Sequence, residues 1–435
     1  MKHHFIIKAA ESILSGIPQN TPYWVDFIND KTVVTERFHP QFDRIFDALH
    51  VRFWVTYEYD TKGKDWDIAE RATGLHRTFR IIMQDDYDLP DNIVQQISAV
   101  PFIERVTALT IGEAKIPDYK PVSTAQALFI DVDSLIHLSY AKTFTKGQKE
   151  IKVAVLDTGV NMSHKELQGK LGKGADFVNL EGIDTSEFIG DIKDYDDVPE
   201  DEVGHGTHVS GIIAARGEDM NEGVCPACTI MPVRVLATMK SNGRLVGAGI
   251  IDNINNGIKW AVDNGANVIN MSLGIKHTGG GLPHEDVIRY ALTKNVTIVA
   301  ASGNDGSPEK YYPGALPGVI AVGATDDKGQ VTSFTSYGAN ISVVAPGLNI
   351  YSCYANHGYA YASGTSQASP FVTGAIGLMK SYAFETGAHL SNSDLVYILK
   401  HTSDKGDNRL RNQRAGYGLI NLVDAFKLLK SIIHS

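Results

Sequence analysis

The chain has few cysteines, an acidic charge balance and no long apolar run. Its 3 cysteines in 435 residues are too few, and an odd number, for a disulfide framework, which fits a reducing interior. A formal net charge of -10 leaves no basic surface that would attract phosphate backbones or anionic lipid. We therefore expect no nucleic acid and no membrane surface among its partners.

The beginning of the chain lacks the pattern of a secretory signal. Its first residues are basic, but Lys8 and Glu11 interrupt what would have to be an unbroken apolar stretch. No run elsewhere approaches the roughly 20 apolar residues that a membrane-spanning helix needs. These absences predict a cytoplasmic protein.

Two of the cysteines, Cys225 and Cys228, form a C-x-x-C pair. Without a second pair of cysteines or histidines, such a pair is a weak sign of zinc. We favour a turn that carries two small buried thiols, with zinc as the alternative. Cys353 stands alone and is expected to be inert.

The hydrophobic pattern changes between residues 117 and 124, which divides the chain into two predicted domains. Before this point, strands at 51–57, 79–83 and 102–106 and a helix at 91–99 predict a small α+β domain. This domain takes residues 1–120, and the residues before about 51 have no assignment within it.

Residues 121–435 alternate strands and helices in the manner of a mostly parallel sheet covered on both faces. Right-handed crossovers then predict an open, doubly wound α/β sheet, in which reactive groups collect beyond the carboxyl ends of the strands. The predicted strands are 151–156, 229–235, 267–271, 297–301 and 318–322, and the predicted helices are 205–216, 250–263, 285–294 and 371–379.

Asp157 ends the first of these strands and is followed by Thr158 and Gly159. A sharp turn after the strand would hold its carboxylate rigidly, as an orienting acid requires. Taken alone, this D-T-G also fits half of an aspartic protease or an ordinary aspartate at a strand end.

His205 begins a predicted helix of small residues in the motif G-H-G-T-H-V-S-G, residues 204–211. The second histidine, His208, raises zinc as an alternative. No carboxylate at the next turn completes the H-E-x-x-H arrangement of a zinc site, however. The motif therefore favours an imidazole that acts as a base.

Ser366 lies in G-T-S-Q-A-S-P, residues 364–370, at the start of an apolar helix. Unpaired N–H groups in a first helical turn favour developing negative charge. The alternative is that Ser366 or Thr365 only caps the helix. The small flanking residues favour the close approach of a substrate, which capping does not need.

These three motifs, in the order Asp, His, Ser on an alternating α/β chain, resemble those of the subtilisin-like serine proteases over roughly residues 121–432. The resemblance implies Ser366 as the nucleophile, His205 as its general base and Asp157 as the orienting acid. It implies Asn304 and the N–H of Ser366 as oxyanion-hole donors, although Asn304 in Gly-Asn-Asp-Gly also fits a simple turn. His208 would be the structural histidine of the family.

The resemblance also implies where the substrate binds. Two small or apolar segments would line the pocket for the side chain before the cut bond, and the substrate backbone would pair as an added strand. Asp305 would lie near the mouth of this pocket and could tolerate a basic side chain. The implied lining residues are Met271, Ser272, Leu273, Gly274, Ala301, Ser302 and Gly303.

An acidic stretch precedes His205, and two interpretations of it stay open. Subtilases often bind a structural calcium ion in such an insertion, and a solvated acidic loop is the alternative. The chemistry itself needs no cofactor. The candidate calcium ligands are Asp191, Asp194, Asp196, Asp197 and Asp201, beside Glu200 and Glu202.

The N-terminal domain falls where this family carries a propeptide, so the resemblance implies a self-processing serine endopeptidase. Its partners would be polypeptide substrates and its own N-terminal domain, an intramolecular inhibitor cut off between about Asp118 and Leu128. A dedicated processing peptidase or transamidase is the alternative, since both reactions pass through the same acyl-enzyme. An inactive pseudoprotease that only binds is the third hypothesis.

Gln367 departs from the methionine that is most familiar after the serine in this family. The change removes an oxidisable thioether from beside the nucleophile. We therefore expect better tolerance of peroxide than a methionine enzyme shows.

Overall fold

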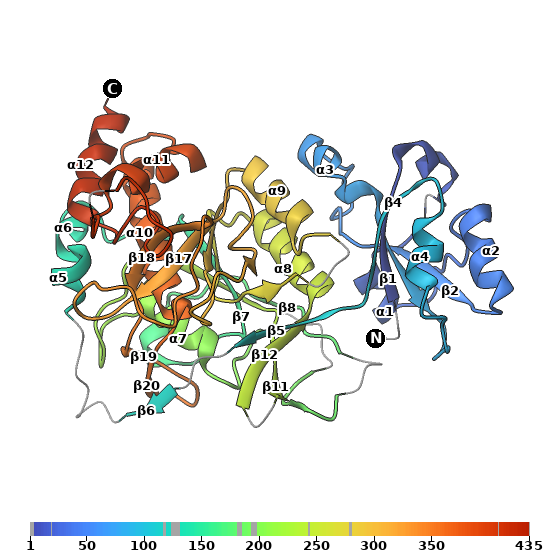
Figure 1. The fold of residues 1–435 in the computed structure, drawn as a ribbon, viewed down its shortest axis with the longest axis horizontal. Coiled ribbons are helices and arrows are strands. Elements are labelled where there is room, and N and C mark those ends of the chain that lie inside the picture. Colours follow the sequence, from blue (N-terminus) through green and yellow to red (C-terminus); the bar gives the residue numbers. More distant parts are fainter. Residues whose placement is uncertain are drawn as a thin grey trace.

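A computed structural model describes residues 4–18, 20–115, 119–122, 131–180, 185–192, 198–241, 244–277, 281–407 and 409–434. Figure 1 shows a smaller N-terminal domain, in blue, beside a larger α/β domain that carries the C-terminus. None of the helices in these residues is long and apolar enough to cross a membrane.

A seven-stranded sheet, parallel at every pairing, forms the centre of the larger domain. The chain winds from β7 to one side and from β13 to the other, so the topological switch point lies between these two strands. Across the sheet the strands are β18 (Ile341–Pro346), β17 (Ile320–Thr325), β15 (Thr297–Ala301), β13 (Val268–Met271), β7 (Lys152–Asp157), β10 (Thr229–Arg234) and β8 (Ala175–Asp176).

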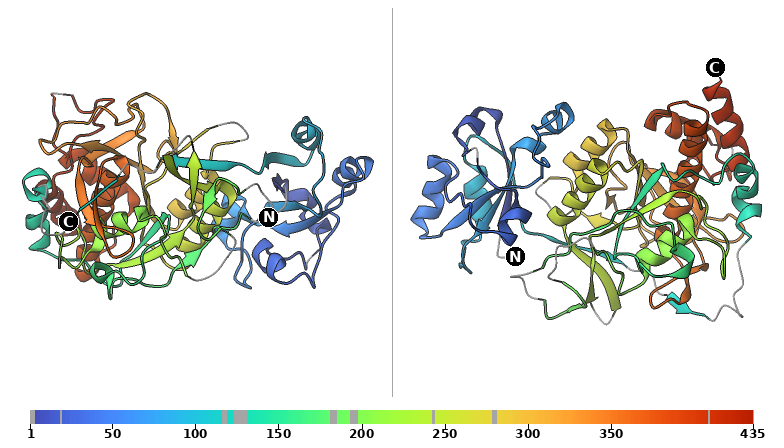
Figure 2. Two further views of the ribbon diagram at one scale, coloured as in Figure 1. Left: turned by 90° about the horizontal axis from the view of Figure 1, so that it is seen from below. Right: turned by 180° about the vertical axis from the view of Figure 1, so that it is seen from behind.

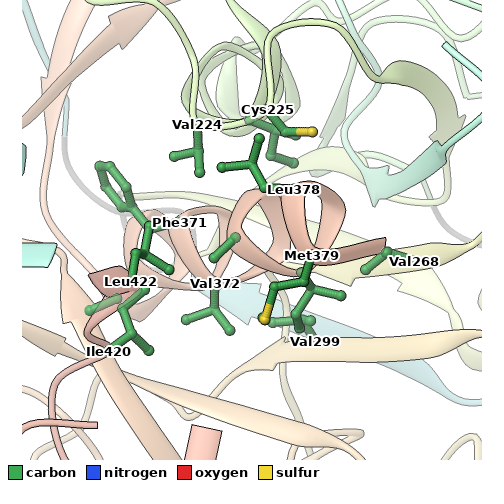
Figure 3. Packing of buried hydrophobic residues seen from close by; sticks show 14 of the residues in the cluster. Val224, Cys225, Val268, Val299, Phe371, Val372, Leu378, Met379, Ile420 and Leu422 are labelled. Carbon is green, nitrogen blue, oxygen red and sulfur yellow. The ribbon is translucent and has the colours of Figure 1, made fainter. Parts of the chain in front are cut away.

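Helices cover both faces of this sheet, as the doubly wound prediction requires. Val153 and Val155 of β7 belong to one apolar core, whereas Ala154 and Leu156 belong to the core on the opposite face. Figure 3 shows apolar side chains of the central helix α10 packed among side chains of the strands and of the C-terminal segment. The first face is covered by α7 (His205–Ala214), α10 (Thr365–Glu385), α11 (Asn392–Thr402) and α12 (Leu422–Ile433), the second by α8 (Ile251–Asp263) and α9 (Glu285–Thr293).

The N-terminal domain is an antiparallel sheet of order β2-β3-β1-β4. The strands and helix predicted within residues 51–106 are confirmed. The elements are β1 (His4–Ala9), β2 (Phe53–Tyr57), β3 (Thr78–Met83) and β4 (Ile103–Ala108), with α1 (Trp24–Asn29), α2 (Pro40–Ala48), α3 (Ile68–Thr73) and α4 (Ile93–Ser98) around them.

Strand β1, which has no assignment from the sequence, lies in the interior of this sheet and is buried along its whole length. Phe5 and Ile7 enter the aromatic core of the N-terminal domain. Ile6 lies on the opposite face, as do His4 and Lys8, which hydrogen-bond to aspartates of the larger domain. Polar residues that are buried in this way hide the alternation by which a half-exposed strand is recognised.

Buried polar contacts join the two domains. The guanidinium of Arg80 pairs with the carboxylate of Glu58 at 2.7 and 2.8 Å, and both side chains are almost fully buried. From α8 of the larger domain, Asn253 accepts hydrogen bonds from Arg80, and Asn256 donates one of 2.5 Å to Glu58. Figures 1 and 2 show the N-terminal sheet beside α8 and α9. Because a buried charge without partners is costly, these contacts fix how the domains dock.

The chain leaves the N-terminal domain as a strand that joins the larger one. β5 (Ile111–Lys115) pairs antiparallel with β12 (Arg244–Ile250), in a small sheet with β11 (Ala237–Ser241) and β9 (Phe188–Ile189). After three residues that the structure does not describe, β6 (Tyr119–Pro121) pairs with β20 (Tyr359–Ala362), which in turn pairs with β19 (Ile350–Cys353).

Candidate active site

Asp157 and His205 form a buried ion pair at the carboxyl edge of the large sheet. Asp157 is the last residue of β7 and His205 the first residue of α7, and Nδ1 of the imidazole lies 2.6 Å from Oδ1 of the carboxylate. Burial alone would lower the pKa of His205, but the charge and hydrogen bond of Asp157 outweigh it and raise the pKa. Nε2 of His205 has no hydrogen-bond partner among the described residues, so it can exchange a proton.

The glycine after His205 lets α7 approach β7 closely. A Cβ atom at Gly206 would lie only 2.1 Å from the carbonyl oxygen of Gly159 and 3.0 Å from Cβ of Asp157. Any side chain at this position would therefore push the helix away from the sheet and break the contact of Asp157 with His205. This steric requirement explains the small residue within the G-H-G motif.

Asp201 braces the turn that precedes His205. Its Oδ1 accepts hydrogen bonds from the Thr158 hydroxyl and from the N–H groups of Val203 and Gly204, and its Oδ2 accepts two from Thr207. A buried carboxylate with all of these protein donors has no place for an ion. The prediction of Asp201 as a calcium ligand is therefore wrong.

The other candidate calcium ligands do not form a site among the described residues. Asp191 is exposed, and its backbone carbonyl accepts a hydrogen bond of 2.5 Å from Arg234. Asp194, Asp196 and Asp197 lie outside the described residues. In the part of the chain that the structure describes, no three His, Cys, Asp or Glu side chains gather as they would around a metal ion.

His208 lies one turn further along α7 and is fully buried. Its Nε2 lies 3.1 Å from the carbonyl oxygen of Ile350 and 3.2 Å from that of Ala360, on strands β19 and β20. Burial, with a smaller contribution from His205, lowers the pKa of His208 to about 3, so the ring stays neutral. This position suits a structural histidine that ties α7 to the neighbouring strands.

Ser366 is held at the start of α10 by a reciprocal contact with Ser272. Because Pro370 has no N–H, the carbonyl of Ser366 lacks its usual helical donor four residues on, and the Ser272 hydroxyl donates to it instead, at 2.8 Å. The hydroxyl of Ser366 donates to the carbonyl of Ser272 at 3.0 Å. The nucleophile candidate is thus fixed between the start of one helix and the end of β13.

Asn304 follows β15 and lies against the same helix start. Its Oδ1 accepts hydrogen bonds from the N–H and the hydroxyl of Thr365, at 2.8 and 3.0 Å. With the oxygen anchored in this way, the amide presents its NH₂ group elsewhere as a donor. Asn304 and Ser366 line one cleft, so the two predicted oxyanion donors border the same space.

A cleft of about 330 Å³ contains most of the predicted substrate-binding residues. Met271 and Ser302 do not line it, since both are buried within the sheet and its edge. That these two contribute to the wall of the substrate pocket stays a prediction. The residues that do line it are Ser272, Leu273, Gly274, Ala301 and Gly303.

The strand that leaves the N-terminal domain also borders this cleft. Thr110, Ile111, Gly112 and Glu113 line it together with Ser366. The backbone of β5 pairs with that of β12, with Gly112 opposite Gly249. The chain's own β5 therefore runs along the groove as an added strand, the geometry in which an extended peptide is recognised.

The two cysteines of the C-x-x-C motif, Cys225 and Cys228, are free thiols that lie away from the cleft, within the core that contains α10. Both are buried, and the N–H of Cys228 donates to the carbonyl of Cys225 at 3.2 Å, which closes a tight turn. The neighbouring thiol of Cys225, and then burial, raise the pKa of Cys228, so it stays protonated. This geometry is that of a turn with two buried thiols. Cys353 is also buried, and its thiol donates to a backbone carbonyl.

Two residues that line the cleft, Thr365 and Tyr311, carry no clear functional signal in the sequence. The local sequence around Thr365 predicts only a helix cap, because its contact with Asn304 joins residues that are 61 positions apart. Tyr311 lines the cleft, yet in the sequence it is only one of two adjacent tyrosines. The run of small residues around Ser366 was the one local signal that could have pointed to Thr365.

Comparison with known proteins gives the family. The model of the subtilase family matches residues 148–418. The chain is 38% identical over 272 residues to the thermophilic serine proteinase of Bacillus sp. (strain AK1), covering 62% of this chain and 60% of that protein. It is 37% identical over 256 residues to thermitase of Thermoactinomyces vulgaris, covering 58% of this chain and 81% of thermitase.

A solved structure shares the fold. The structure of the prenylagaramide maturation protease PagA superimposes with a TM-score of 0.55 at 29% identity, covering 67% of this chain and 98% of that one. The family match includes the carboxyl edge of the sheet, where Asp157, His205, Asn304 and Ser366 lie, and it excludes the N-terminal domain. The chain belongs to the subtilase family of serine proteases.

Proposed function

We propose that the chain is a serine endopeptidase in which Asp157, His205 and Ser366 act as a catalytic triad. The observation that carries the proposal is the buried imidazole of His205, held through Nδ1 by Asp157 while Nε2 has no partner among the described residues. Such an imidazole is oriented, and its pKa is raised, for taking up one proton.

In the first step, Oγ of Ser366 attacks the carbonyl carbon of the scissile bond as Nε2 of His205 removes the hydroxyl proton. The hydroxyl donates to the Ser272 carbonyl in the structure, so it must first rotate about its Cα–Cβ bond towards the imidazole. The tetrahedral intermediate then loses the amine, which takes the proton back from His205. Water hydrolyses the acyl-enzyme by the same steps.

The developing negative oxygen needs donors that are already in place. The NH₂ group of Asn304 and the N–H of Ser366 would supply them, the second because it belongs to the first turn of α10 and has no helical acceptor. Two hydrogen bonds from Thr365 hold the Asn304 amide in orientation. Donors fixed before the reaction stabilise the transition state without having to reorganise.

We further propose that the N-terminal domain inhibits the enzyme until the enzyme cuts it off. The pairing of β5 with β12 supports this, because it fills one side of the cleft with the chain's own backbone. The domain is held there by the buried contacts of Glu58 and Arg80 with α8. The proposed cleavage interval, residues 118–128, includes the described residues 119–122, which contain strand β6, and the rest of it lies outside the described residues.

A second candidate is a dedicated processing peptidase. The similarity to PagA, a protein described as a maturation protease, favours it. Incubation with casein and with short peptides separates the two functions, because a broad degrader cuts both whereas a dedicated processor spares casein. A transamidase would join an added amine to the peptide instead of releasing an acid.

The test of self-processing follows the length of the chain over time in wild type and in Ser366→Ala, and sequences any new N-terminus. Ser363→Ala is the matched control, since Ser363 lies three residues before Ser366 and its hydroxyl contacts, among the described residues, only the side chain and backbone of Asn349. We expect wild type and Ser363→Ala to shorten and Ser366→Ala to stay intact. Equal shortening of all three would contradict the proposal.

A further inference from the structure

Two glycines, Gly274 and Gly303, line the cleft that Ser366 and Asn304 also line. A peptide whose carbonyl carbon meets Oγ of Ser366, with its oxygen towards Asn304, must place the preceding side chain next to both groups. Both glycines lie against the same side chain of the cleft, Tyr311. In this way the geometry identifies where the side chain before the cut bond would enter.

The ring of Tyr311 already reaches both of these glycines. A Cβ atom built on Gly303 would lie 2.3 Å from Cδ2 and 2.5 Å from Cε2 of Tyr311, and one built on Gly274 would lie 2.9 Å from its Cβ. The tyrosine lines the same cleft as Ser366. The ring of Tyr311 therefore occupies part of the space beside Gly274 and Gly303.

Contacts on three sides hold the ring in this position. The Tyr311 hydroxyl donates to the carboxylate of Asp305, and the backbone of β16 (Tyr311–Tyr312) pairs with that of β14 (Ile275–Lys276). The ammonium of Lys276 lies 5.5 Å from the ring centre and 3.3 Å from the Asp305 carboxylate. Burial, followed by the contact with Asp305, raises the pKa of Tyr311, so the hydroxyl remains a donor.

We propose that Tyr311 is the specificity-determining residue of this cleft and that it restricts the side chain before the cut bond to small residues such as glycine, alanine and serine. The inference rests on the proposed peptidase function and adds its substrate class. A large side chain could enter only if Tyr311 swung away from Asp305, which would break a hydrogen bond to a carboxylate and expose a buried ring.

The same contacts bear on basic substrates. The Asp305 carboxylate already accepts a hydrogen bond from the Tyr311 hydroxyl and forms an ion pair with Lys276. The negative charge of Asp305 is therefore already balanced when a substrate lysine enters the cleft. Lys276 itself is about half exposed and also lies 3.8 Å from Glu309. Under this proposal Asp305 acts by holding the tyrosine, and it does not select a basic side chain.

The test measures kcat/KM on a series of peptides that differ only in the residue before the cut bond: alanine, valine, phenylalanine and lysine. The full chain is incubated until its length no longer changes, and a serine-reactive phosphonate counts the competent active sites. We compare wild type, Tyr311→Gly and the matched control Tyr311→Phe, which keeps the ring and loses only the hydroxyl.

We expect wild type to favour alanine over phenylalanine by at least about 100-fold, as a closed pocket discriminates by size. Tyr311→Gly should reverse this order, Tyr311→Phe should keep alanine first with a smaller ratio, and lysine should be poor for wild type. Tyr311→Ala serves as a second opened variant, with the same expectation, if Tyr311→Gly does not fold.

Two results would overturn the inference alone: a wild type that prefers phenylalanine or lysine, or an opened variant that keeps the wild-type ratio while its active sites titrate fully. Absence of both phosphonate labelling and peptide turnover in wild type would instead overturn the proposed function, and the inference with it. The phosphonate reading therefore separates the two failures.

Discussion

Replacing Thr365 by valine should slow catalysis without weakening substrate binding. The Thr365 hydroxyl donates to Oδ1 of Asn304 at 3.0 Å and accepts the N–H of Gly303 at 3.2 Å, and it is fully buried. Valine has nearly the same shape but offers neither contact, so the Asn304 amide would be held by the Thr365 N–H alone. The residue acts by positioning Asn304 and touches no reacting atom itself.

The size of the effect follows from the one lost bond to Asn304. A neutral hydrogen bond contributes about 0.5–1.5 kcal/mol, which corresponds to roughly 2- to 13-fold in rate. The upper limit is the loss of the whole side chain of an oxyanion-hole asparagine, which in subtilisin costs about 10²–10³ in kcat. We therefore expect kcat to fall about 2- to 13-fold, with KM unchanged, because the bond is used in the transition state.

Steady-state kinetics on one peptide substrate, corrected for active sites by phosphonate titration, measure this effect. Thr365→Ser is the control, since it keeps the hydroxyl and should retain kcat within about 2-fold. A valine variant with the wild-type kcat, or one in which KM alone rises, would refute the positioning role of Thr365.

Three further predictions concern the domain interface, the pH profile and oxidation. Asn256→Ala should lower the free energy of unfolding by about 2–4 kcal/mol in chemical denaturation, because it removes a hydrogen bond of 2.5 Å to the buried Glu58 carboxylate and a second contact across the interface. Activity should be lost as the pH falls through the raised pKa of His205. The acid limb of the pH profile of kcat/KM should therefore lie above 6.5, the usual pKa of a histidine. Asp157→Asn should move this limb to lower pH, because it removes the charge that raises the pKa. Gln367→Met should raise the free energy of unfolding by about 1–3 kcal/mol, because both polar atoms of the Gln367 amide are buried without hydrogen-bond partners among the described residues. The same variant should make activity sensitive to peroxide, because the methionine thioether can be oxidised.

Each of these has a result that would contradict it. Asn264→Ala, at the residue that follows α8, is the control for the interface, because among the described residues the Asn264 side chain donates only to the carbonyl of Trp260 in that helix. The interface account fails if this variant is destabilised as much as Asn256→Ala, with both measured in Ser366→Ala to prevent processing. An acid limb that is unmoved by Asp157→Asn would contradict the ion-pair origin of the raised pKa. Equal survival of wild type and Gln367→Met in peroxide would contradict the oxidation argument.

Local sequence patterns predicted five of the seven strands of the large sheet, because these strands are buried on both faces and form short apolar runs between helices; β18 and the two-residue β8 were not predicted. The alternation of Val153, Ala154, Val155 and Leu156 between two cores is the physical basis of that pattern. The interior strand β1 escaped prediction because His4 and Lys8 look solvent-exposed until Asp252 and Asp286 of the other domain are placed opposite them. A hydrogen bond between residues that are more than 240 positions apart leaves no pattern in the local sequence.

In the site, too, local motifs predict some residues, whereas others are identified only by contacts between distant parts of the chain. Asp157, His205 and Ser366 stand in motifs whose small residues are needed for close backbone approach, so the motif itself carries the information. The helix that holds Ser366 begins at Thr365, earlier than the predicted 371, because Pro370 is tolerated where the Ser272 hydroxyl replaces the missing donor. The role of Tyr311 follows only from its contacts with Gly274 and Gly303, which lie far from each other in the chain.

The most direct test of the central claim is to locate the covalent adduct that a serine-reactive phosphonate forms with the processed wild-type chain. Peptide mapping by mass spectrometry should find one phosphonyl group per chain on Ser366, with no adduct in Ser366→Ala and much slower labelling in His205→Ala. Labelling of another residue, or labelling of Ser366→Ala at the wild-type rate, would contradict the account of Ser366 as a nucleophile activated by His205.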